Sequence, residues 1–311
     1  MEENLVSILI PTYNRVNIIR ETIESAICQT YKNIEIIIVD NCSTDGTSEI
    51  LENYGAIDSR IRIFKNEKNL GPVLNWEICL NMAQGVYSKF LWSDDLIKTT
   101  FIEDALNYFD NETAFVLSGI EFFDDNGTLC KTTFQNRALY TTTRYLDELL
   151  IYKDIDFPVS PGCALFRTAD LKKSLVINIS NNLNLDFSQF GAGNDLLFFL
   201  ITAMNYKYVK TTSTIQSYFR AHSNSFSVAN KLDLFYFYST YYYVKIYRKD
   251  LYSKFYTAIK LRSLLTSNHY YLDNIEKGSF DMKVIFNFIY KKIFKKFINS
   301  LFQLSGLVHS K

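Results

Sequence analysis

Paired cysteines, net charge and long apolar segments are all missing from this chain of 311 residues. The five cysteines are Cys28, Cys42, Cys79, Cys130 and Cys163. They are odd in number and form no C-x-x-C pair, which argues against a disulfide framework and against a zinc site. The 33 basic and 33 acidic residues cancel, so no overall field attracts a nucleic acid. No stretch of about twenty residues is free of charge, and the N-terminus has no basic and apolar leader. We therefore expect a cytoplasmic protein that is neither secreted nor membrane-spanning.

Two phosphate-binding motifs are missing as well. No G-x-G-x-x-G follows the first expected strand, and no G-x-x-x-x-G-K-[ST] occurs anywhere. A phosphate-bearing ligand would then need a metal ion. Asp94 and Asp95 are candidates to hold one, because hard divalent cations take carboxylate oxygens and leave positions open for phosphate.

The N-terminal part of the chain alternates between expected strands and helices. Leu5 to Ile10 and Ile34 to Val39 are apolar except for Ser7 and Glu35, and such runs are typical of buried parallel strands. Arg60 to Lys65 and Val86 to Trp92 predict two more strands, and segments with helical spacing lie between the four. This alternation predicts a doubly wound α/β sheet with right-handed crossovers.

Polar residues follow the ends of these expected strands. In a doubly wound sheet, ligands bind outside the carboxyl ends of the strands. The residues that this rule brings to one edge are Tyr13, Asn14, Arg15, Asp40, Asp94 and Asp95. Two adjacent carboxylates repel each other, so the Asp94-Asp95 pair suggests a cation or a set of donors that both share. A loop in which both carboxylates are simply solvated is the alternative.

Several motifs of this region together resemble the family 2 glycosyltransferases, which have the GT-A fold. They are V-S-I-L-I-P-T-Y-N-R at 6–15, I-I-I-V-D-N-C-S-T-D-G-T at 36–47, Asn69-x-Gly71, Asn75, Ala83-x-Gly85 and Ser93-Asp94-Asp95. They occur in the order and spacing of that family. The resemblance implies a Rossmann-like, doubly wound and mostly parallel central sheet. We expect it to be followed by a helical C-terminal extension.

The resemblance also implies an activity and a set of site residues. The activity is transfer of a sugar from a nucleotide-diphosphate sugar, usually a UDP-sugar, to an acceptor hydroxyl with inversion. The donor-binding candidates are Pro11, Thr12, Tyr13, Asn14, Arg15, Asp40, Asn75 and Asp94. Among these, Asp40 matches the contact to the base and Asp94 the contact to the ribose, while Asp95 matches the ligand of a Mn²⁺ or Mg²⁺ on the diphosphate. Ser93 stands where the acidic motif of the family often begins with Asp.

Asn194 and Asp195 open an apolar helix in the second half of the chain. A carboxylate in a first helical turn commonly does no more than favour the helix dipole. The family, however, commonly carries Glu-Asp or a variant here, with the Asp as general base. We therefore assign Asp195 as the base that takes the proton from the acceptor hydroxyl, with Asn194 in support. The segment from Phe157 to Arg167 resembles the one that lines the acceptor side in this family.

Arg220-x-His222 resembles the family pattern Arg-x-His-x-x-Ser-x-Ser. There the histidine approaches the metal or the diphosphate, and the arginine offers donors to phosphate. A hydrogen-bonded structural histidine is the alternative for His222. The adjacent Asp124 and Asp125 receive no metal role, because Asp-Asp-Asn-Gly is a hairpin turn sequence.

We divide the chain into a glycosyltransferase domain, 1–225, and a helical, aromatic- and Lys-rich region, 226–311. The domain has a nucleotide-sugar half, 1–98, and an acceptor half, 99–225. Between 282 and 304, aromatic and aliphatic residues share one helical face and lysines the other, which suits the surface of an anionic bilayer. A helix docked on the protein explains the same pattern.

Taken together, these features predict an inverting glycosyltransferase of O-antigen or capsule synthesis. Its partners would be a nucleotide-sugar, a lipid-linked glycan acceptor and the inner face of the cytoplasmic membrane, with no nucleic acid. A catalytically degenerate nucleotide-sugar-binding or scaffold protein is the alternative, because Ser93 and Asn194 depart from the commonest pattern. A retaining glycosyltransferase or a nucleotidyltransferase fits the motif set less well.

Overall fold

The structure is a computed structural model that describes residues 4–134, 138–153, 155, 157–221, 232–266 and 275–290. Contacts divide the chain into two compact units. The first comprises Met1–Leu146 and Ile155–Tyr243, and the second comprises Asp147–Asp154 and Val244–Lys311. The predicted division after residue 225 falls outside the described residues and stays a prediction.

Within the described residues, ten strands of the first unit form one sheet. Their order is β3-β2-β1-β4-β9-β6-β10-β5, with β7 paired to β6 and β8 paired to β10. The strands are β1 (Val6–Thr12), β2 (Ile34–Asp40), β3 (Ile61–Lys65), β4 (Tyr87–Phe90), β5 (Leu96–Ile97), β6 (Thr113–Asp124), β7 (Gly127–Thr132), β8 (Leu139–Thr141), β9 (Ala164–Arg167) and β10 (Tyr208–Arg220).

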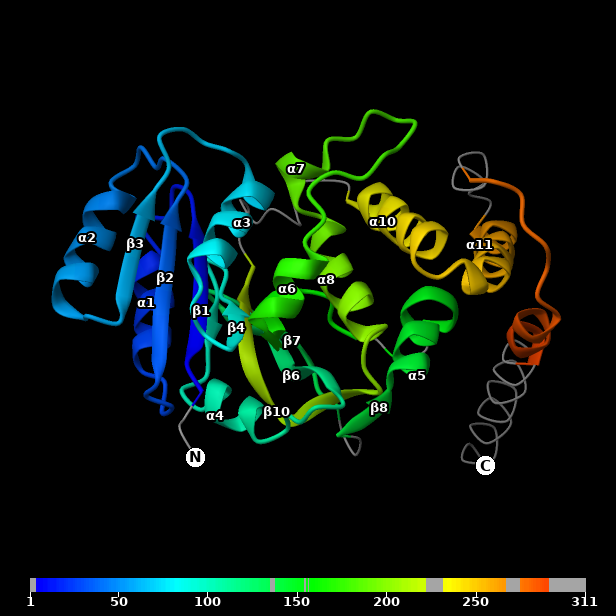
Figure 1. The fold of residues 1–311 in the computed structure, drawn as a ribbon, viewed down its shortest axis with the longest axis horizontal. Helices are drawn as coiled ribbons and strands as arrows, with labels where there is room; N and C mark the ends of the chain where they lie inside the picture. Colours follow the sequence, from blue (N-terminus) through cyan, green and yellow to red (C-terminus); the bar gives the residue numbers. More distant parts are fainter. Residues whose placement is uncertain are drawn as a thin grey trace, which may run out of the picture. The chain divides into compact units, whose positions relative to one another are not determined.

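The sheet has two parallel parts joined by one antiparallel strand. β3, β2, β1 and β4 run parallel to one another, as Figure 1 shows for the three strands nearest the edge. β6 and β10 are also parallel, and β9 pairs antiparallel with both β4 and β6. Parallel neighbours require crossover helices, which is the alternation that the sequence shows. The predicted α/β fold with a mostly parallel, doubly wound sheet is confirmed.

Helices connect the strands of the first unit and cover both faces of the sheet. They are α1 (Ile19–Ile27), α2 (Thr47–Ile57), α3 (Pro72–Met82), α4 (Phe101–Leu106), α5 (Thr142–Asp147), η2 (Pro161–Cys163), α6 (Thr168–Ser174), α7 (Phe187–Phe190), α8 (Asn194–Ala203) and α10 (Asp233–Ile246). One core cluster packs α1, α2 and α4 against one face. α3 packs on β1 and β2 from the other face.

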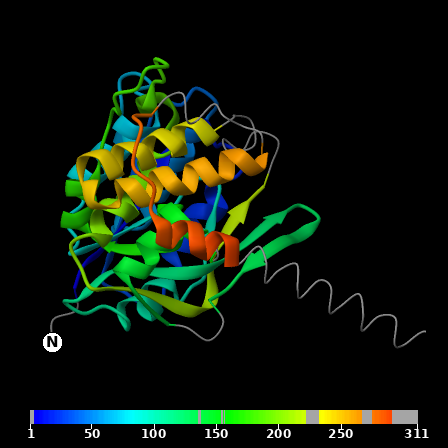
Figure 2. The same ribbon diagram turned by 90° about the vertical axis from the view of Figure 1, so that its right-hand side faces the viewer.

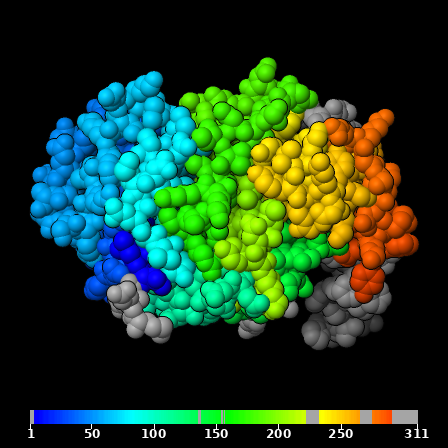
Figure 3. Space-filling view, viewed as in Figure 1, coloured from blue at the N-terminus to red at the C-terminus, as the bar shows by residue number. Residues whose placement is uncertain are grey.

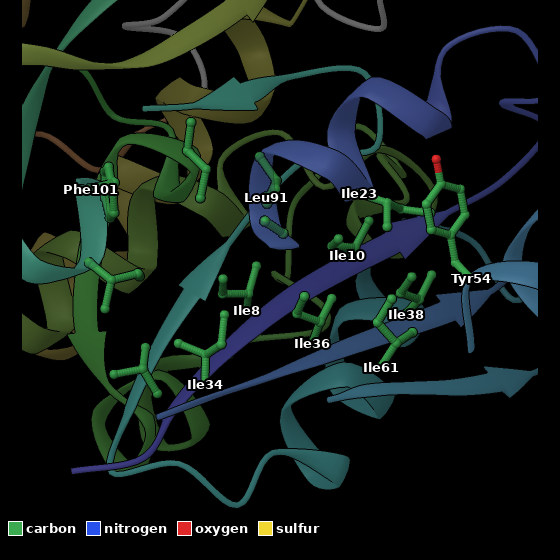
Figure 4. Packing of buried hydrophobic residues seen from close by; sticks show 14 of the residues in the cluster. Ile8, Ile10, Ile23, Ile34, Ile36, Ile38, Tyr54, Ile61, Leu91 and Phe101 are labelled. Atoms are coloured by element: carbon green, nitrogen blue, oxygen red, sulfur yellow. The ribbon is translucent and has the colours of Figure 1, made fainter. Parts of the chain in front are cut away.

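The positions of the side chains of β1 and β2 explain why these strands are mostly apolar. Ile8 and Ile10 of β1 point into the core cluster, together with Ile36 and Ile38 of β2 (Figure 4). Successive side chains of a strand point to opposite faces, so Leu9 faces the α3 side and is also fully buried. Strands buried on both faces lose the polar alternation of a half-exposed sheet.

The predicted hairpin turn at 124–127 is confirmed. Asp124 pairs with Gly127, and β6 and β7 run antiparallel on either side of the turn, side by side in Figure 2. The carboxylate of Asp124 accepts a hydrogen bond of 2.8 Å from the N–H of Asn126. This bond gives Asp124 the turn role that its sequence context predicts.

The second unit contains η1 (Glu148–Tyr152), η3 (Lys249–Leu251), α11 (Tyr252–Thr266) and a helical segment at 282–290. The N–H of Asp281 donates to the hydroxyl of Thr257 at 2.8 Å, so the start of the 282–290 helix is tied to α11. The predicted amphipathic helix at 282–304 is helical as far as residue 290, and its remainder lies outside the described residues. None of the helices in the described ranges combines the length and the apolar character that a membrane crossing needs.

Candidate functional site

The carboxyl ends of β1 and β2 meet at the edge where a ligand was predicted. Thr12 is opposite Asp40 in the parallel register. The Asp40 carboxylate is buried, and it accepts hydrogen bonds from the N–H of Ser43 at 3.0 Å and from the hydroxyl of Ser48. Asp40 therefore closes the loop between β2 and α2, and a contact from it to a nucleotide base stays a prediction.

The loop after β1 is locked to the loop after β2. Asn14 has a φ of 52°, in the left-handed region that asparagine tolerates better than most residues. Its N–H donates to the Ser43 hydroxyl and its Oδ1 accepts from the N–H of Thr44, both at 2.9 Å. The N–H of Arg15 donates to the Thr47 hydroxyl at 2.8 Å. Because both loops are fixed, their polar edge is preformed.

Other predicted donor-binding residues differ in how accessible they are. Tyr13 is 41% exposed, whereas Pro11 and Thr12 are buried in the last residues of β1. Asn75 is also buried, and it donates to the carbonyl of Val39 and accepts from the amide of Asn66, both at 3.0 Å. Of this group, Tyr13 has the accessible side chain, and Asn75 supports the loop from behind.

The carboxylate pair lies between β4 and β5, flanked by two arginines. The Oδ2 of Asp94 is 3.7 Å from the guanidinium of Arg15. Asp95 is 6% exposed, and its Oδ1 accepts from the backbone N–H of Arg220 at 2.9 Å. The Nε of Arg220 donates to the carbonyl of Asp94 at 3.2 Å. The structure thus brings together four of the predicted residues, from the loop after β1, the segment between β4 and β5, and the end of β10.

Two further facts describe the surroundings of the pair. The side chain of Ser93 is buried next to it. The guanidinium of Arg220 forms an ion pair of 2.6 Å with Glu21 on α1. Arg220 therefore holds the pair through its backbone and Nε while its terminal nitrogens contact α1. His222, the predicted neighbour of this group, lies outside the described residues.

Burial and charge perturb the titration of the groups beneath the pair. Burial, and next the charge of Asp94, raises the pKa of Asp95 well above its ordinary value. Lys89 of β4 is fully buried, and burial lowers its pKa to about 7. Its Nζ donates to the carbonyl of Gly162 and lies 4.4 Å from the ring centroid of Phe101. Sequence reasoning missed Lys89, although a lysine inside an otherwise apolar strand was the available signal.

The pair suits a hard divalent cation in one binding mode. Mg²⁺ is usually held by one or two carboxylates, with substrate phosphates and water in the remaining positions. In the part of the chain that the structure describes, no group of three or more His, Cys, Asp or Glu side chains gathers around one point. With two carboxylates, Asp94 and Asp95 match the mode in which substrate phosphates complete the coordination of a Mn²⁺ or Mg²⁺, and their binding of such an ion stays a prediction.

Asp195 stands at the start of α8 and is held by three donors. Its Oδ1 accepts from the backbone N–H groups of Gly193 and Leu196, both at 2.8 Å. The hydroxyl of Tyr236, on α10, donates to its Oδ2 at 2.9 Å. Burial raises the pKa of Asp195 to about 6 although the residue keeps partial exposure. The helix-capping alternative thus accounts for Oδ1, and it leaves Oδ2 to be explained.

The neighbour Asn194 has a different task. It is fully buried, and its amide donates to the carbonyls of Val176 and Ile177. It therefore fixes the start of α8 to the preceding loop. Tyr236 was missed by sequence reasoning, which described the region around it only as helical and rich in aromatic residues and lysine.

An aromatic cluster connects the strand that leads to the pair with the segment that leads to Asp195. The ring centroids of Trp76 and Trp92 are 5.1 Å apart, and the indole N–H of Trp92 donates to the Ser160 hydroxyl at 2.8 Å. At Gly191, which has a φ of 69°, a Cβ would lie 2.5 Å from the Trp76 ring. Figure 3 shows the cyan surface around α3 meeting the green surface of the later segments, and contacts of α3 with α6 and α7 agree.

A family model decides what this arrangement belongs to. Residues 7–175, more than half of the chain, match the model described as glycosyl transferase family 2. The chain belongs to glycosyl transferase family 2. The resemblance inferred from its motifs is thereby confirmed.

Two curated relatives of this family 2 member carry specific names. One is the UDP-Glc:alpha-D-GlcNAc-diphosphoundecaprenol beta-1,3-glucosyltransferase WfaP of Escherichia coli, 30% identical over 73% of this chain and 81% of that protein. The other is TuaG of Bacillus subtilis, a glycosyltransferase named for teichuronic acid biosynthesis, 39% identical over 40% of this chain. That match spans 50% of TuaG, so the chain spans about half of this relative's length.

Solved structures agree with the fold. TarS 1–349 of S. aureus, in a complex with UDP-GlcNAc, superposes with a TM-score of 0.64 over 86% of this chain and 75% of that one. The two sequences are 21% identical, so this likeness concerns the fold.

Proposed function

We propose that this family 2 member transfers a sugar from a UDP-sugar to a hydroxyl of a glycan acceptor, with inversion at the anomeric carbon. The observation that carries the proposal is the separation of its acidic groups into two sites. Asp94 and Asp95 stand together between two arginines, whereas Asp195 stands on α8, where its described hydrogen-bond partners are two backbone N–H groups and the Tyr236 hydroxyl. The Asp94-Asp95 site suits the diphosphate leaving group, and the Asp195 site suits the acceptor hydroxyl.

The leaving group is a nucleoside diphosphate, on which negative charge develops as the sugar departs. Asp94 and Asp95 would hold a Mn²⁺ or Mg²⁺, which when bound neutralises charge on the diphosphate. Arg15, beside Asp94, has a guanidinium that offers donors to phosphate oxygens. Arg220 supports the pair through its backbone N–H and its Nε.

The acceptor hydroxyl is proposed to meet Asp195. As its oxygen attacks C1 of the donor sugar, the hydroxyl proton passes to Asp195, and the bond from C1 to the diphosphate oxygen breaks with its electron pair on the diphosphate. Attack from the face opposite the leaving group inverts the anomeric carbon. With a pKa of about 6, Asp195 is mostly ionised at pH 7 and is still basic enough to take a proton.

The names of the relatives support a substrate class. WfaP is named for a UDP-Glc donor and an acceptor on diphosphoundecaprenol, and TuaG for teichuronic acid. We therefore propose a lipid-linked glycan acceptor and a role in cell-surface polysaccharide synthesis, of the O-antigen or capsule type. Which sugar is moved depends on a few pocket hydrogen bonds.

Substitutions of the two acidic sites test this proposal. Asp195→Asn should lower kcat by about 10²- to 10⁴-fold, the usual contribution of a general base, with UDP binding unchanged. Asp95→Asn should weaken Mn²⁺-dependent UDP binding. Asp125→Asn is the matched control, because Asp124 and Asp125 are also adjacent but occupy the hairpin turn. Near-normal transfer by Asp195→Asn would refute the base, and unchanged metal dependence in Asp95→Asn would refute the metal ligand.

A donor-binding protein without turnover is the second candidate. Asn194 favours this second candidate, because its side chain is fully buried and its amide nitrogen donates to two backbone carbonyl groups. Calorimetry with a panel of UDP-sugars, with and without Mn²⁺, followed by an assay for released UDP, separates the two candidates. Binding without release of UDP on any lipid-linked acceptor favours the scaffold.

Contact with an anionic membrane at the inner face of the cytoplasmic membrane is part of the proposal. Large apolar side chains of 280–290 are exposed: Phe280 by 55%, Met282 by 55%, Phe286 by 65%, Ile289 by 47% and Tyr290 by 66%. Lys283, also exposed, adds a positive charge to the same helix. In a sedimentation assay with vesicles of anionic lipid, Phe286→Ser with Ile289→Ser should lose binding, whereas Leu129→Ser in the hairpin should keep it. Equal binding by both variants would contradict membrane contact by this helix.

A further inference from the structure

Among the residues that the structure describes, the hydrogen bonds of Asp195 occupy three of its acceptor positions and leave one on Oδ2. A carboxylate offers about four lone-pair positions, two on each oxygen. Oδ1 uses both of its positions on the N–H groups of Gly193 and Leu196. Oδ2 uses one on the hydroxyl of Tyr236. The remaining lone pair of Oδ2 is the one that can receive a proton.

The helix that carries Tyr236 is docked against this segment at several independent points. A Cβ at Gly193 would lie 2.7 Å from the carbonyl oxygen of Phe235, so α10 and the start of α8 approach as closely as glycine permits. The ring of Phe235 lies 5.0 Å from those of Phe187 and Phe190, measured between centroids. Loss of the Tyr236 hydroxyl alone therefore leaves α10 in place.

We propose that Tyr236 is a positioning residue that orients the Asp195 carboxylate, so that one lone pair of Oδ2 faces the acceptor hydroxyl. This inference rests on the proposed role of Asp195 as general base. Tyr236 keeps its own proton throughout, because burial and the charge of Asp195 raise its pKa far above neutrality. It therefore donates to the carboxylate and does not itself take part in proton transfer.

The same hydrogen bond sets the acidity of the base. Burial raises the pKa of Asp195, and donation from Tyr236 lowers it by stabilising the ionised form. Other charged or titratable groups lie on elements packed against α8: Glu121 and Asp124 on β6, Cys163 on η2, Asp170, Lys172 and Lys173 on α6, and Asp233 and Lys245 on α10. The Cys163 thiol stays neutral, since burial raises its pKa to about 12. Asp170 accepts from the hydroxyl of Tyr206, and Lys172 donates to the carbonyl of Ala83.

Tyr236→Phe tests the assignment through the pH profile of transfer. Without the donor, the pKa of Asp195 rises, so the acid limb of kcat/KM should move upward by about one pH unit. The loss should be about tenfold at pH 5 and nearly absent at pH 8.5, where Asp195 is ionised in both proteins. Tyr238→Phe is the matched control, because it removes from the same helix a hydroxyl that donates to Asn182 and not to Asp195. Its acid limb should coincide with that of the wild type.

A second variant keeps the proposal testable if Tyr236→Phe does not fold. Tyr236→3-fluorotyrosine keeps the shape of the ring and makes the hydroxyl a stronger donor, so it should move the acid limb to lower pH. An unmoved limb in either variant, or a loss that is equal at every pH, would overturn the role of Tyr236. Asp195→Asn separates this failure from that of the proposed function. An active Asp195→Asn refutes the base itself, whereas an inactive one beside an unmoved Tyr236→Phe limb refutes the positioning residue alone.

Discussion

We expect Lys89 to make the unfolding free energy of the first unit rise as the pH increases above neutrality. It is fully buried in β4, and Lys89→Met replaces it with an unbranched side chain of similar length and no charge. Burial lowers the pKa of Lys89 from 10.5 to about 7, so between these values the unfolded chain binds a proton that the folded protein has released. Stability therefore rises as the pH rises through this window, because the unfolded state binds more protons. Lys89→Met lacks this dependence.

The size of the effect follows from the width of the window. One unit of pKa shift corresponds to about 1.4 kcal/mol, so a shift of this width amounts to about 5 kcal/mol in all. Between pH 7.5 and 9.5, the wild type should gain about 2 to 3 kcal/mol of unfolding free energy relative to Lys89→Met. Near neutral pH we expect the variant to be the more stable protein, because replacing a buried charge by an apolar side chain is often stabilising.

Urea unfolding at several pH values measures this difference. Both tryptophans, Trp76 and Trp92, belong to the first unit, so intrinsic fluorescence reports its unfolding. Lys65→Met is the control, since Lys65 is an exposed lysine at the end of β3. Its unfolding free energy should run parallel to that of the wild type. If the curves of wild type and Lys89→Met also run parallel from pH 7.5 to 9.5, Lys89 is not a buried amine of lowered pKa, and the reasoning fails.

Three other changes have expected outcomes. Gly193→Ala should lower the unfolding free energy of the first unit by about 3 kcal/mol, because of left-handed backbone strain and the close approach to Phe235. Gly127→Ala, at a φ of 123° with open space around it, should lower it by about 1 kcal/mol, and equal losses in urea unfolding would contradict the close packing at Gly193. UDP with Mn²⁺ should change the tryptophan fluorescence of the wild type and of Trp76→Phe but not that of Trp92→Phe, because Trp92 lies two residues before Asp94. A fluorescence change that persists in Trp92→Phe would place the nucleotide elsewhere. EDTA should abolish transfer, and Mn²⁺ or Mg²⁺ should restore it; full activity in EDTA would remove the metal from the proposal.

The parts of the fold that the sequence predicts are those whose signal is local. β1 and β2 are readable because burial on both faces makes most of their residues apolar. The turn at Asp124 is readable because its hydrogen bond spans two residues. β10, which begins at Tyr208, is not readable in this way, because its first half is rich in threonine and serine and has no apolar run. This segment is a strand because it pairs with β6, and a local stretch of sequence does not show which strand it will pair with.

The parts of the site that sequence reasoning missed depend on contacts between distant segments. The hydrogen bond from Tyr236 to Asp195 joins residues 41 apart, and the one from Arg220 to Asp95 joins residues 125 apart. A tyrosine-rich helix gives no indication of which hydroxyl will meet a carboxylate. Motif resemblance recovers Asp195 and Arg220, since the family pattern includes their positions. It does not recover Tyr236 or Lys89, because the sequence shows the residue types around them but not the distant groups that they contact.

The separation of the acidic groups has a chemical reason. The Asp94-Asp95 pair has the cationic side chains of Arg15 and Arg220 beside it, and a bound metal ion would offset the burial and the mutual repulsion that raise the pKa of Asp95. A general base beside the same cations would be too acidic to hold a proton at neutral pH. Asp195 instead accepts from neutral donors, two backbone N–H groups and one phenol, and burial keeps its pKa near 6. The two sets of carboxylates thus differ in their neighbours, which are cationic for the pair and neutral for Asp195, and this difference suits the proposed division between an anionic leaving group and a proton acceptor.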